Sequence, residues 1–178
     1  MPTEKHALVT VGATAPFPRL IQQLLTPSVL TTLTSLNYTH LTIQHGLTPT
    51  NYGGTSDGES LLATLNTFTP PFTSPTSSST SLNIASFPFS DSLQDEMAKS
   101  DLVISHAGSG SILDALRMTK KLIVVPNEEL MDNHQKELAR ELERQGYLVD
   151  STPEYAYILT PPHFPFDSIA LERFFLMG

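Results

Sequence analysis

A glycine- and serine-rich turn at residues 108–111 is the part of the sequence best suited to binding an anion. It follows the apolar run 102–105, and Ser109, Gly110 and Ser111 would open a helix. Glycine lets the backbone approach a ligand closely, and the first N–H groups of a helix have no internal partner. Because the helix dipole adds partial positive charge there, the pattern favours binding of a phosphate or a ribose.

The carboxylate of Asp114, three residues after Ser111, has two interpretations. It could close a box-like cap on its own helix, which the spacing alone favours. Alternatively, it could accept hydrogen bonds from the vicinal hydroxyls of a sugar.

A second polar helix start follows the next apolar run. Asp132 is a natural N-cap there, and the following Asn133, His134 and Gln135 all have side chains that can form hydrogen bonds. A capping box between Asp132 and Gln135 is the alternative to ligand binding.

A third loop, Gly12, Ala13 and Thr14, follows the first apolar run, and alone it would be an ordinary turn from a strand to a helix. Open parallel sheets bind ligands at the carboxyl ends of their strands. The three loops together therefore favour a ligand site more strongly than any one of them.

These loops would be positioned by alternating strands and helices. Apolar runs predict strands at 6–11, 41–44, 82–87, 102–105 and 122–125, and helical spacing predicts helices at 19–36, 91–99, 111–117 and 133–145. Pro27 should break the first helix, and Leu138, Ala139 and Leu142 should face inward from the last. The pattern predicts an α/β fold with a Rossmann-like parallel sheet and helices on both faces.

The length of 178 residues fits one domain, 1–178. Residues 48–81 are rich in serine, threonine and proline, and we expect a mobile surface insertion there, because its apolar content is too low to pack. The tail 167–178 is unusually apolar. We expect it to be buried, either on the edge of its own sheet or on a second protein.

Composition excludes several classes of function. The net charge of −8 and the lack of a basic cluster argue against nucleic acid as a partner. The chain has no cysteine, no secretory leader and no apolar run of about 20 residues, so we expect a soluble cytosolic protein. It has no dinucleotide fingerprint, nucleophile elbow or P-loop lysine, and its six histidines form no H-x-x-x-H pair, so no metal site is expected.

Four segments carry a resemblance to a known family: VTVGAT at 9–14, IQHG at 43–46, DLVISHAGSGSILDALR at 101–117 and KLIVVPNEELMDNHQKELARELERQGYL at 121–148. They resemble the catalytic subunits of the endoplasmic-reticulum UDP-N-acetylglucosamine transferases. Those subunits are similar to the donor-binding, C-terminal half of GT-B enzymes, the C-terminal domain of glycosyltransferase family 28.

The resemblance implies transfer of N-acetylglucosamine from UDP-N-acetylglucosamine to N-acetylglucosaminyl-diphosphodolichol, with inversion, in the assembly of the N-glycan precursor. It also implies a heterodimer, in which a membrane-anchored, acceptor-binding subunit recruits this chain from the cytoplasm to the cytosolic face of the endoplasmic reticulum. No cofactor and no metal in the site are implied. The alternative is a non-catalytic or differently specific nucleotide-sugar-binding protein.

The resemblance also implies a role for each candidate residue. Asp114 would bind the ribose hydroxyls, which reverses the preference for a cap. The diphosphate would face the turn formed by Gly12, Ala13 and Thr14, and the uracil would meet the backbone near Phe89 and Ser90. The nucleotide would be lined by Gly108, Ser109, Gly110 and Ser111. His134 and Gln135 would contact the sugar, and Asn133 beside them is also a candidate substrate-binding residue.

His106 is the candidate catalytic base. An orienting or packing role for its ring is the alternative, and the base could instead belong to the partner. The candidate cations for the diphosphate are Lys5, Arg19, Lys99, Arg117, Lys120 and Lys121.

Overall fold

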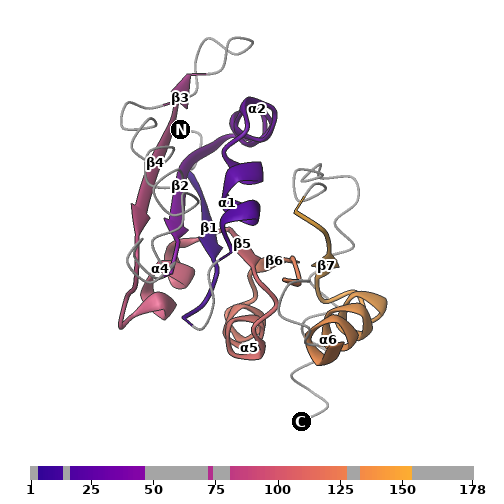
Figure 1. Ribbon diagram of the computed structural model, residues 1–178. Coiled ribbons are helices and arrows are strands. Elements are labelled where there is room, and N and C mark those ends of the chain that lie inside the picture. The colour runs from indigo at the N-terminus through magenta and orange to yellow at the C-terminus, as the bar shows by residue number, and fades with distance from the viewer. Residues whose placement is uncertain (1–3, 14–16, 47–71, 74–80, 128–132, 154–178) are drawn as a thin grey trace, which may run out of the picture.

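Seven strands form one sheet, in the order β3-β4-β2-β1-β5-β6-β7 (Figure 1). The structure is a computed structural model that describes residues 4–13, 17–46, 72–73, 81–127 and 133–153. The strands are β1 (Lys5–Thr10), β2 (Tyr38–Gln44), β3 (Phe72–Thr73), β4 (Ser81–Phe87), β5 (Leu102–Ser105), β6 (Lys121–Val124) and β7 (Val149–Asp150).

The sheet is doubly wound around β1. This strand pairs in parallel with β2 on one side and with β5 on the other, and β4, β6 and β7 extend the parallel sheet outward. Only β3, which pairs with β4, is antiparallel among the described strands. The strand order therefore reverses between β1 and β5, and that switch point is where open α/β sheets bind their ligands.

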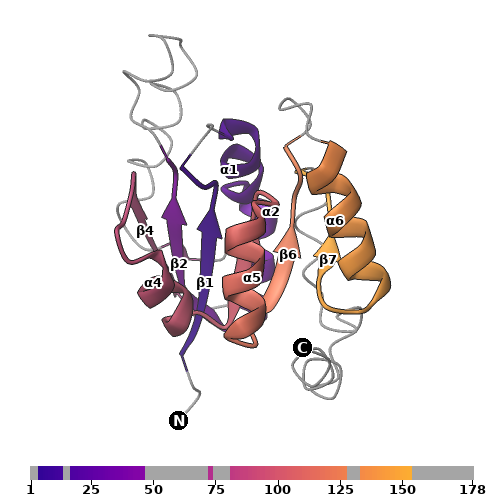
Figure 2. The same ribbon diagram turned by 90° about the horizontal axis from the view of Figure 1, so that it is seen from below.

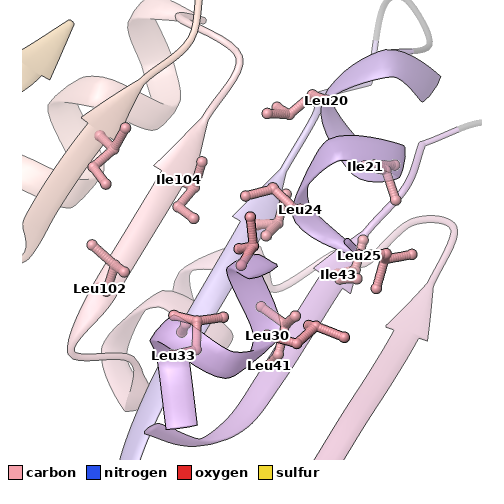
Figure 3. Packing of buried hydrophobic residues seen from close by; sticks show 14 of the residues in the cluster. Leu20, Ile21, Leu24, Leu25, Leu30, Leu33, Leu41, Ile43, Leu102 and Ile104 are labelled. Atoms are coloured by element: carbon pink, nitrogen blue, oxygen red, sulfur yellow. The ribbon is translucent and has the colours of Figure 1, made fainter. Parts of the chain in front are cut away.

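Helices cover both faces of the sheet (Figure 2). One face carries α1 (Pro18–Leu24) and α2 (Pro27–Ser35), and the other carries α4 (Leu93–Lys99), α5 (Ser109–Arg117) and α6 (Asn133–Arg144). Figure 3 shows Leu20, Leu24 and Leu33 packed over the side chains of the sheet, among them Leu41, Ile43, Leu102 and Ile104. These side chains are fully or almost fully buried.

The alternation of strands and helices confirms the predicted fold class. The helix predicted at 19–36 is broken as expected, because Pro27 lacks the N–H that would continue α1 and instead begins α2. Leu138 was assigned to the buried side of α6 wrongly. It is 37% exposed, whereas Ala139 and Leu142 are buried.

The sequence pattern misses two short strands. β3 and β7 have two residues each, too few to show a periodicity. β3 lies within the insertion predicted at 48–81, so Phe72 and Thr73 correct that prediction, and Ser81 already belongs to β4. The rest of the insertion, Thr14, Asp132 and the tail 167–178 lie outside the described residues. Within the described part of the chain, no helix is long and apolar enough to cross a membrane.

Candidate functional site

The loops that follow β1 and β5 meet at the switch point. Thr10, the last residue of β1, is the register partner of Ser105, the last residue of β5. The backbone N–H of His106 donates to the carbonyl oxygen of Thr10 at 3.1 Å, which extends the pairing by one step. Two of the three loops predicted to bind the ligand are therefore neighbours.

The imidazole ring of His106 lies between two glycines. A Cβ built on Gly12 would lie 2.4 Å from Cε1 of His106, and one built on Gly108 would lie 2.6 Å from its Nε2. A side chain at either position would therefore overlap the ring. Gly12 also has a φ of +76°, which other residues rarely adopt. Both glycines are needed to admit the histidine ring.

The hydrogen bonding and burial of His106 define its chemistry. Its Nδ1 lies 3.3 Å from the carbonyl oxygen of Thr10, which can only accept, so Nδ1 carries the proton. Nε2 is then an acceptor. Burial lowers the pKa of His106 below its ordinary value of 6.5, and the hydrogen bond to Thr10 opposes this only in part. The ring is therefore neutral near pH 7.

The lowered pKa predicts that acid destabilises the fold. Below about pH 6.5 the unfolded chain binds a proton at His106 that the folded chain resists, so the free energy of unfolding should fall as the pH falls from about 7. His45, whose pKa burial also lowers, contributes in the same direction. Urea unfolding at about pH 7.5 and 5.5 should give a smaller difference for His106→Asn than for the parent chain.

Asp150 sets the lowest pH at which the effect of the histidines on stability can be measured separately. Burial, with Glu143 nearby, raises the pKa of this carboxyl, so it gains a proton more readily in the folded chain and opposes the histidine effect at lower pH. An equal pH dependence in His106→Asn and the parent chain would contradict the assignment of a buried, neutral ring.

A buried glutamine ties three parts of the site together. The Oε1 atom of Gln44 accepts from the Thr10 hydroxyl at 2.7 Å and from the Gly12 N–H at 3.2 Å. Its Nε2 atom donates to the carbonyl oxygens of Gly12 at 2.9 Å and of Pro88 at 3.1 Å. Gln44 is only 3% exposed. It therefore fixes the turn after β1 against the loop after β4.

The predicted site residues did not include Gln44 or Thr10. Each ends a buried strand with a polar side chain, and the two are register partners in the sheet. The sequence does contain this signal, since a buried polar residue must find a hydrogen-bond partner. It can be read only after β1 and β2 are known to be neighbours.

The N-terminus of α5 presents to the switch point backbone N–H groups that have no acceptor among the described residues. Gly108 is the N-cap and has no side chain with which to cap the helix, and the first intrahelical bond runs from the Ile112 N–H to its carbonyl oxygen at 3.0 Å. The N–H groups of Ser109, Gly110 and Ser111 precede that bond. Ala107, just before, has a φ of 75°, a conformation that is uncommon outside glycine and turns the chain sharply.

The capping interpretation of Asp114 is wrong. Because α5 begins at Ser109, Asp114 lies in its second turn, beyond the free N–H groups. The Oδ2 atom accepts from Nε2 of Gln94 at 3.1 Å, and Oδ1 lies 3.6 Å from a guanidinium nitrogen of Arg117. The side chain is 27% exposed. A carboxylate has about four acceptor positions, so Asp114 can also accept from a ligand.

The loop after β4 holds the residues assigned to uracil. Phe89 is 58% exposed, and the hydroxyl of Ser90 accepts from the Ser92 N–H at 3.1 Å. Gln44 holds Pro88 at the start of this loop, and Gln94 in α4 holds Asp114 in α5. The loop after β4 leads directly into α4, whose Gln94 side chain contacts the Asp114 carboxylate, so the loop and this carboxylate are positioned together. The aromatic ring of Phe89 is exposed to solvent.

The residues assigned to the sugar begin α6. The His134 side chain is 94% exposed, and its Nδ1 lies 3.8 Å from a carboxylate oxygen of Glu137. The Oε1 atom of Gln135 is buried and has no hydrogen-bond partner among the described residues, which leaves an acceptor unused at this helix start. Asn133 is the first residue of the helix.

Most of the candidate cations lie away from this edge. Lys5 donates to the carbonyl oxygen of Leu36, Lys99 pairs with Glu96, and Lys120 donates to the carbonyl oxygen of Ala98. These contacts, and Lys121 at the start of β6, belong to the opposite, amino edge of the sheet. Arg117 lies in the last turn of α5, beside Asp114. Arg19, in the first turn of α1, is the candidate at the carboxyl edge.

Comparison with known families gives one match over most of the chain. The family described as glycosyltransferase family 28 C-terminal domain matches residues 6–155.

Relatives in several organisms, among them Yarrowia lipolytica, Kluyveromyces lactis and Mus musculus, carry the name UDP-N-acetylglucosamine transferase subunit ALG13. The Yarrowia lipolytica protein is 39% identical over 84% of this chain, and the Kluyveromyces lactis protein is 41% identical over 79%. The Mus musculus protein is 37% identical over 81% of this chain. The matched region spans 66% of the Yarrowia protein, 76% of the Kluyveromyces protein and 10% of the mouse protein.

Solved structures agree with the fold. The NMR structure of an ALG13 protein superposes with a TM-score of 0.63 and 32% identity, covering 96% of this chain and 94% of that one. The crystal structure of Acinetobacter baumannii MurG gives a TM-score of 0.60 at 18% identity, covering all of this chain and 42% of that one. The second likeness concerns the fold alone.

Proposed function

This chain belongs to the glycosyltransferase family 28 C-terminal domain family, and from that premise we propose that it binds the donor of a glycosyl transfer reaction. The donor is UDP-N-acetylglucosamine. This assignment is supported by the relatives, which are named as UDP-N-acetylglucosamine transferase subunits.

The observation that carries the proposal is the meeting of two backbone turns at the switch point. The turn at Gly12 and the free N–H groups at the start of α5 adjoin, because β1 and β5 are paired. Such donors can hold a diphosphate in a chain whose net charge is −8. Asp114, in the second turn of α5, is proposed to accept from the ribose hydroxyls, and the backbone near Phe89 and Ser90 is proposed to meet the base.

The proposed acceptor is N-acetylglucosaminyl-diphosphodolichol, and the product is chitobiosyl-diphosphodolichol. The acceptor hydroxyl attacks the anomeric carbon and forms the new glycosidic bond. The bond from that carbon to the diphosphate oxygen breaks, and UDP leaves with the electron pair, so the configuration is inverted. The helix N-terminus stabilises the charge that grows on the leaving group, and this step needs no metal at the site.

His106 is proposed to orient the two turns. Its ring fills the space between Gly12 and Gly108, and its protonated Nδ1 is held by the Thr10 carbonyl. The base that takes the proton of the acceptor hydroxyl is proposed to lie on a partner. That partner is a membrane-anchored, acceptor-binding subunit, which holds this chain at the cytosolic face of the endoplasmic reticulum. The word "subunit" in the names of the relatives supports the existence of a partner subunit.

Transfer from labelled UDP-N-acetylglucosamine to a lipid-diphosphate acceptor tests the proposal. The purified chain should bind the donor weakly and transfer nothing, whereas the chain co-expressed with an acceptor-binding subunit should form the disaccharide. Appreciable transfer by the chain alone would remove the two-subunit claim. Release of an epimerised sugar would instead indicate a nucleotide-sugar enzyme of different specificity.

Asp114→Ala separates donor binding from a structural role. Because Asp114 does not cap α5, we expect the free energy of unfolding to change by less than about 1 kcal/mol. Loss of a charge-assisted hydrogen bond to the ribose should raise the KM for UDP-N-acetylglucosamine about tenfold. Steady-state kinetics of the assembled pair and urea unfolding of the chain measure the two effects.

Arg117→Ala is the matched control for that experiment. It removes the neighbouring charge 3.6 Å from Asp114 but keeps the carboxylate. We expect its KM to stay within about twofold of the parent value, since exposed ion pairs contribute little. An unchanged KM in Asp114→Ala would contradict the ribose assignment.

A further inference from the structure

Two histidines and a glutamate gather at the edge of the sheet opposite to the donor site. Glu4, His6 and His40 each offer one ligand atom, and these atoms all lie within 4.8 Å of one another. Glu4 immediately precedes β1, His6 lies near its start, and His40 lies near the start of β2. Among the described residues, this is the one group of three potential metal-ligating side chains.

The pairing of β1 with β2 brings the histidines together. His6 and His40 are register partners, although 34 residues separate them in the sequence. Ala7 and Leu41, the next residues, belong to the core under α1 and α2. Because side chains alternate along a strand, both histidines project from the other face of the sheet. The register of β1 with β2 shifts between Lys5 and His6, immediately before the two paired histidines.

The two imidazole rings are already close and nearly parallel. Their centroids are 4.3 Å apart and their planes differ by 19°. Ligand atoms on a tetrahedral zinc ion lie about 3.3 Å apart, given zinc–ligand distances of about 2.0–2.1 Å. The ligand atoms must move from separations of up to 4.8 Å to about 3.3 Å. Rotation of the two rings and of the exposed Glu4 side chain can bring them that much closer.

Neighbouring groups orient both histidines. The hydroxyl of Thr39 lies 3.0 Å from Nδ1 of His40, so Nε2 of that ring is the nitrogen left for a metal. The backbone N–H of His6 donates to a carboxylate oxygen of Asp101 at 2.8 Å, and the Asp101 N–H donates back to the His6 carbonyl at 2.8 Å. The backbone that carries His6 is therefore fixed before any ion binds.

We propose that Glu4, His6 and His40 form a binding site for a divalent transition-metal ion of the zinc type. Two imidazoles and one carboxylate suit zinc, with water as the fourth ligand. Magnesium and calcium prefer six or more oxygen ligands, which this cluster does not offer. The site lies at the amino edge of the sheet and is separate from the function proposed above.

The ion would join the segment before β1 to β2. Its three ligands are assembled only when the strands are paired, so the ion should bind the folded chain in preference to the unfolded one. Zinc should therefore raise the Tm of the full chain, and EDTA should reverse the rise. The readout is independent of transferase activity.

Calorimetric titration of the full chain with ZnCl2 at about pH 7.5 tests the site. One ion should bind per chain. His40→Asn and Glu4→Gln should each weaken binding at least about tenfold, and His6→Asn combined with His40→Asn should abolish it. Circular dichroism in EDTA verifies that each variant is folded, and the zinc-dependent rise in Tm should disappear in step with binding.

His134→Gln is the matched control. His134 and Glu137 form an exposed pair that offers two ligands rather than three. The control should bind zinc like the parent chain, and MgCl2 should give no comparable heat with either. The proposal is overturned if zinc does not bind, if His134→Gln removes the binding, or if folded His40→Asn binds zinc as tightly as the parent chain.

Discussion

Replacing Gly108 with alanine should lower kcat/KM of the proposed transferase pair about hundredfold and destabilise the chain by about 2 kcal/mol. The φ of Gly108 is −64°, which alanine adopts without strain. The added Cβ would, however, lie 2.6 Å from Nε2 and 2.7 Å from Cε1 of His106. The same two ring atoms also pack against Gly12, where an added Cβ would lie 2.4 Å from Cε1, so the ring has little room to move away. Kinetics of the pair and urea unfolding measure both effects.

Two further variants isolate the cause of that loss. A Cβ on Gly110 would have no atom within 4 Å, so Gly110→Ala should keep or slightly raise the free energy of unfolding. His106→Ala combined with Gly108→Ala removes the ring that the methyl group meets, and it should be more stable than the sum of the single changes predicts. If Gly108→Ala unfolds at the same urea concentration as Gly110→Ala, the ring does not fill this space.

Gln44→Leu should cost about 3 kcal/mol of stability and about hundredfold in kcat/KM. Leucine has a similar size but leaves the Thr10 hydroxyl proton and the carbonyl oxygens of Gly12 and Pro88 without their partner, while the Gly12 N–H keeps only the Thr10 hydroxyl oxygen, at 3.3 Å. A buried group without a partner costs about 1–3 kcal/mol, and the part-buried carbonyl oxygens of Gly12 and Pro88 cost less because water can reach them. Urea unfolding and the amide chemical shift of Gly12 measure the loss.

Gln44→Glu tests which half of the amide matters. A carboxylate can still accept from the Thr10 hydroxyl and the Gly12 N–H, but it cannot donate to the carbonyl oxygens of Gly12 and Pro88. We expect it to lose as much stability near pH 7 as the leucine variant. Parent-like stability and activity in Gln44→Glu would show that the two donated bonds do not hold the site.

The sequence predicts those parts of the fold that depend on local pattern. The run at 102–105 is a fully buried strand with the predicted bounds, and the amphipathic segment from Asn133 forms α6. The helix after Gly108 was predicted two residues too late, because serine and glycine are weak helix formers. That small error in the boundary is what allowed Asp114 to be interpreted as a cap.

Features that depend on strand pairing could not be predicted from local pattern. The contact of His106 with Gly12, and the network around Gln44, join segments far apart in the chain. The same limit applies to His6 and His40. A search for two histidines one helical turn apart cannot find a pair that two parallel strands bring into register.

The central place of β1 also has a consequence for synthesis on the ribosome. One of its two neighbours, β5, lies about 95 residues later, since the His6 backbone meets Asp101 across that separation. At roughly 5–20 residues per second, the ribosome needs about 5–20 s to supply the missing strand. During that interval one edge of β1 remains unpaired, which makes the nascent chain a natural client for a chaperone.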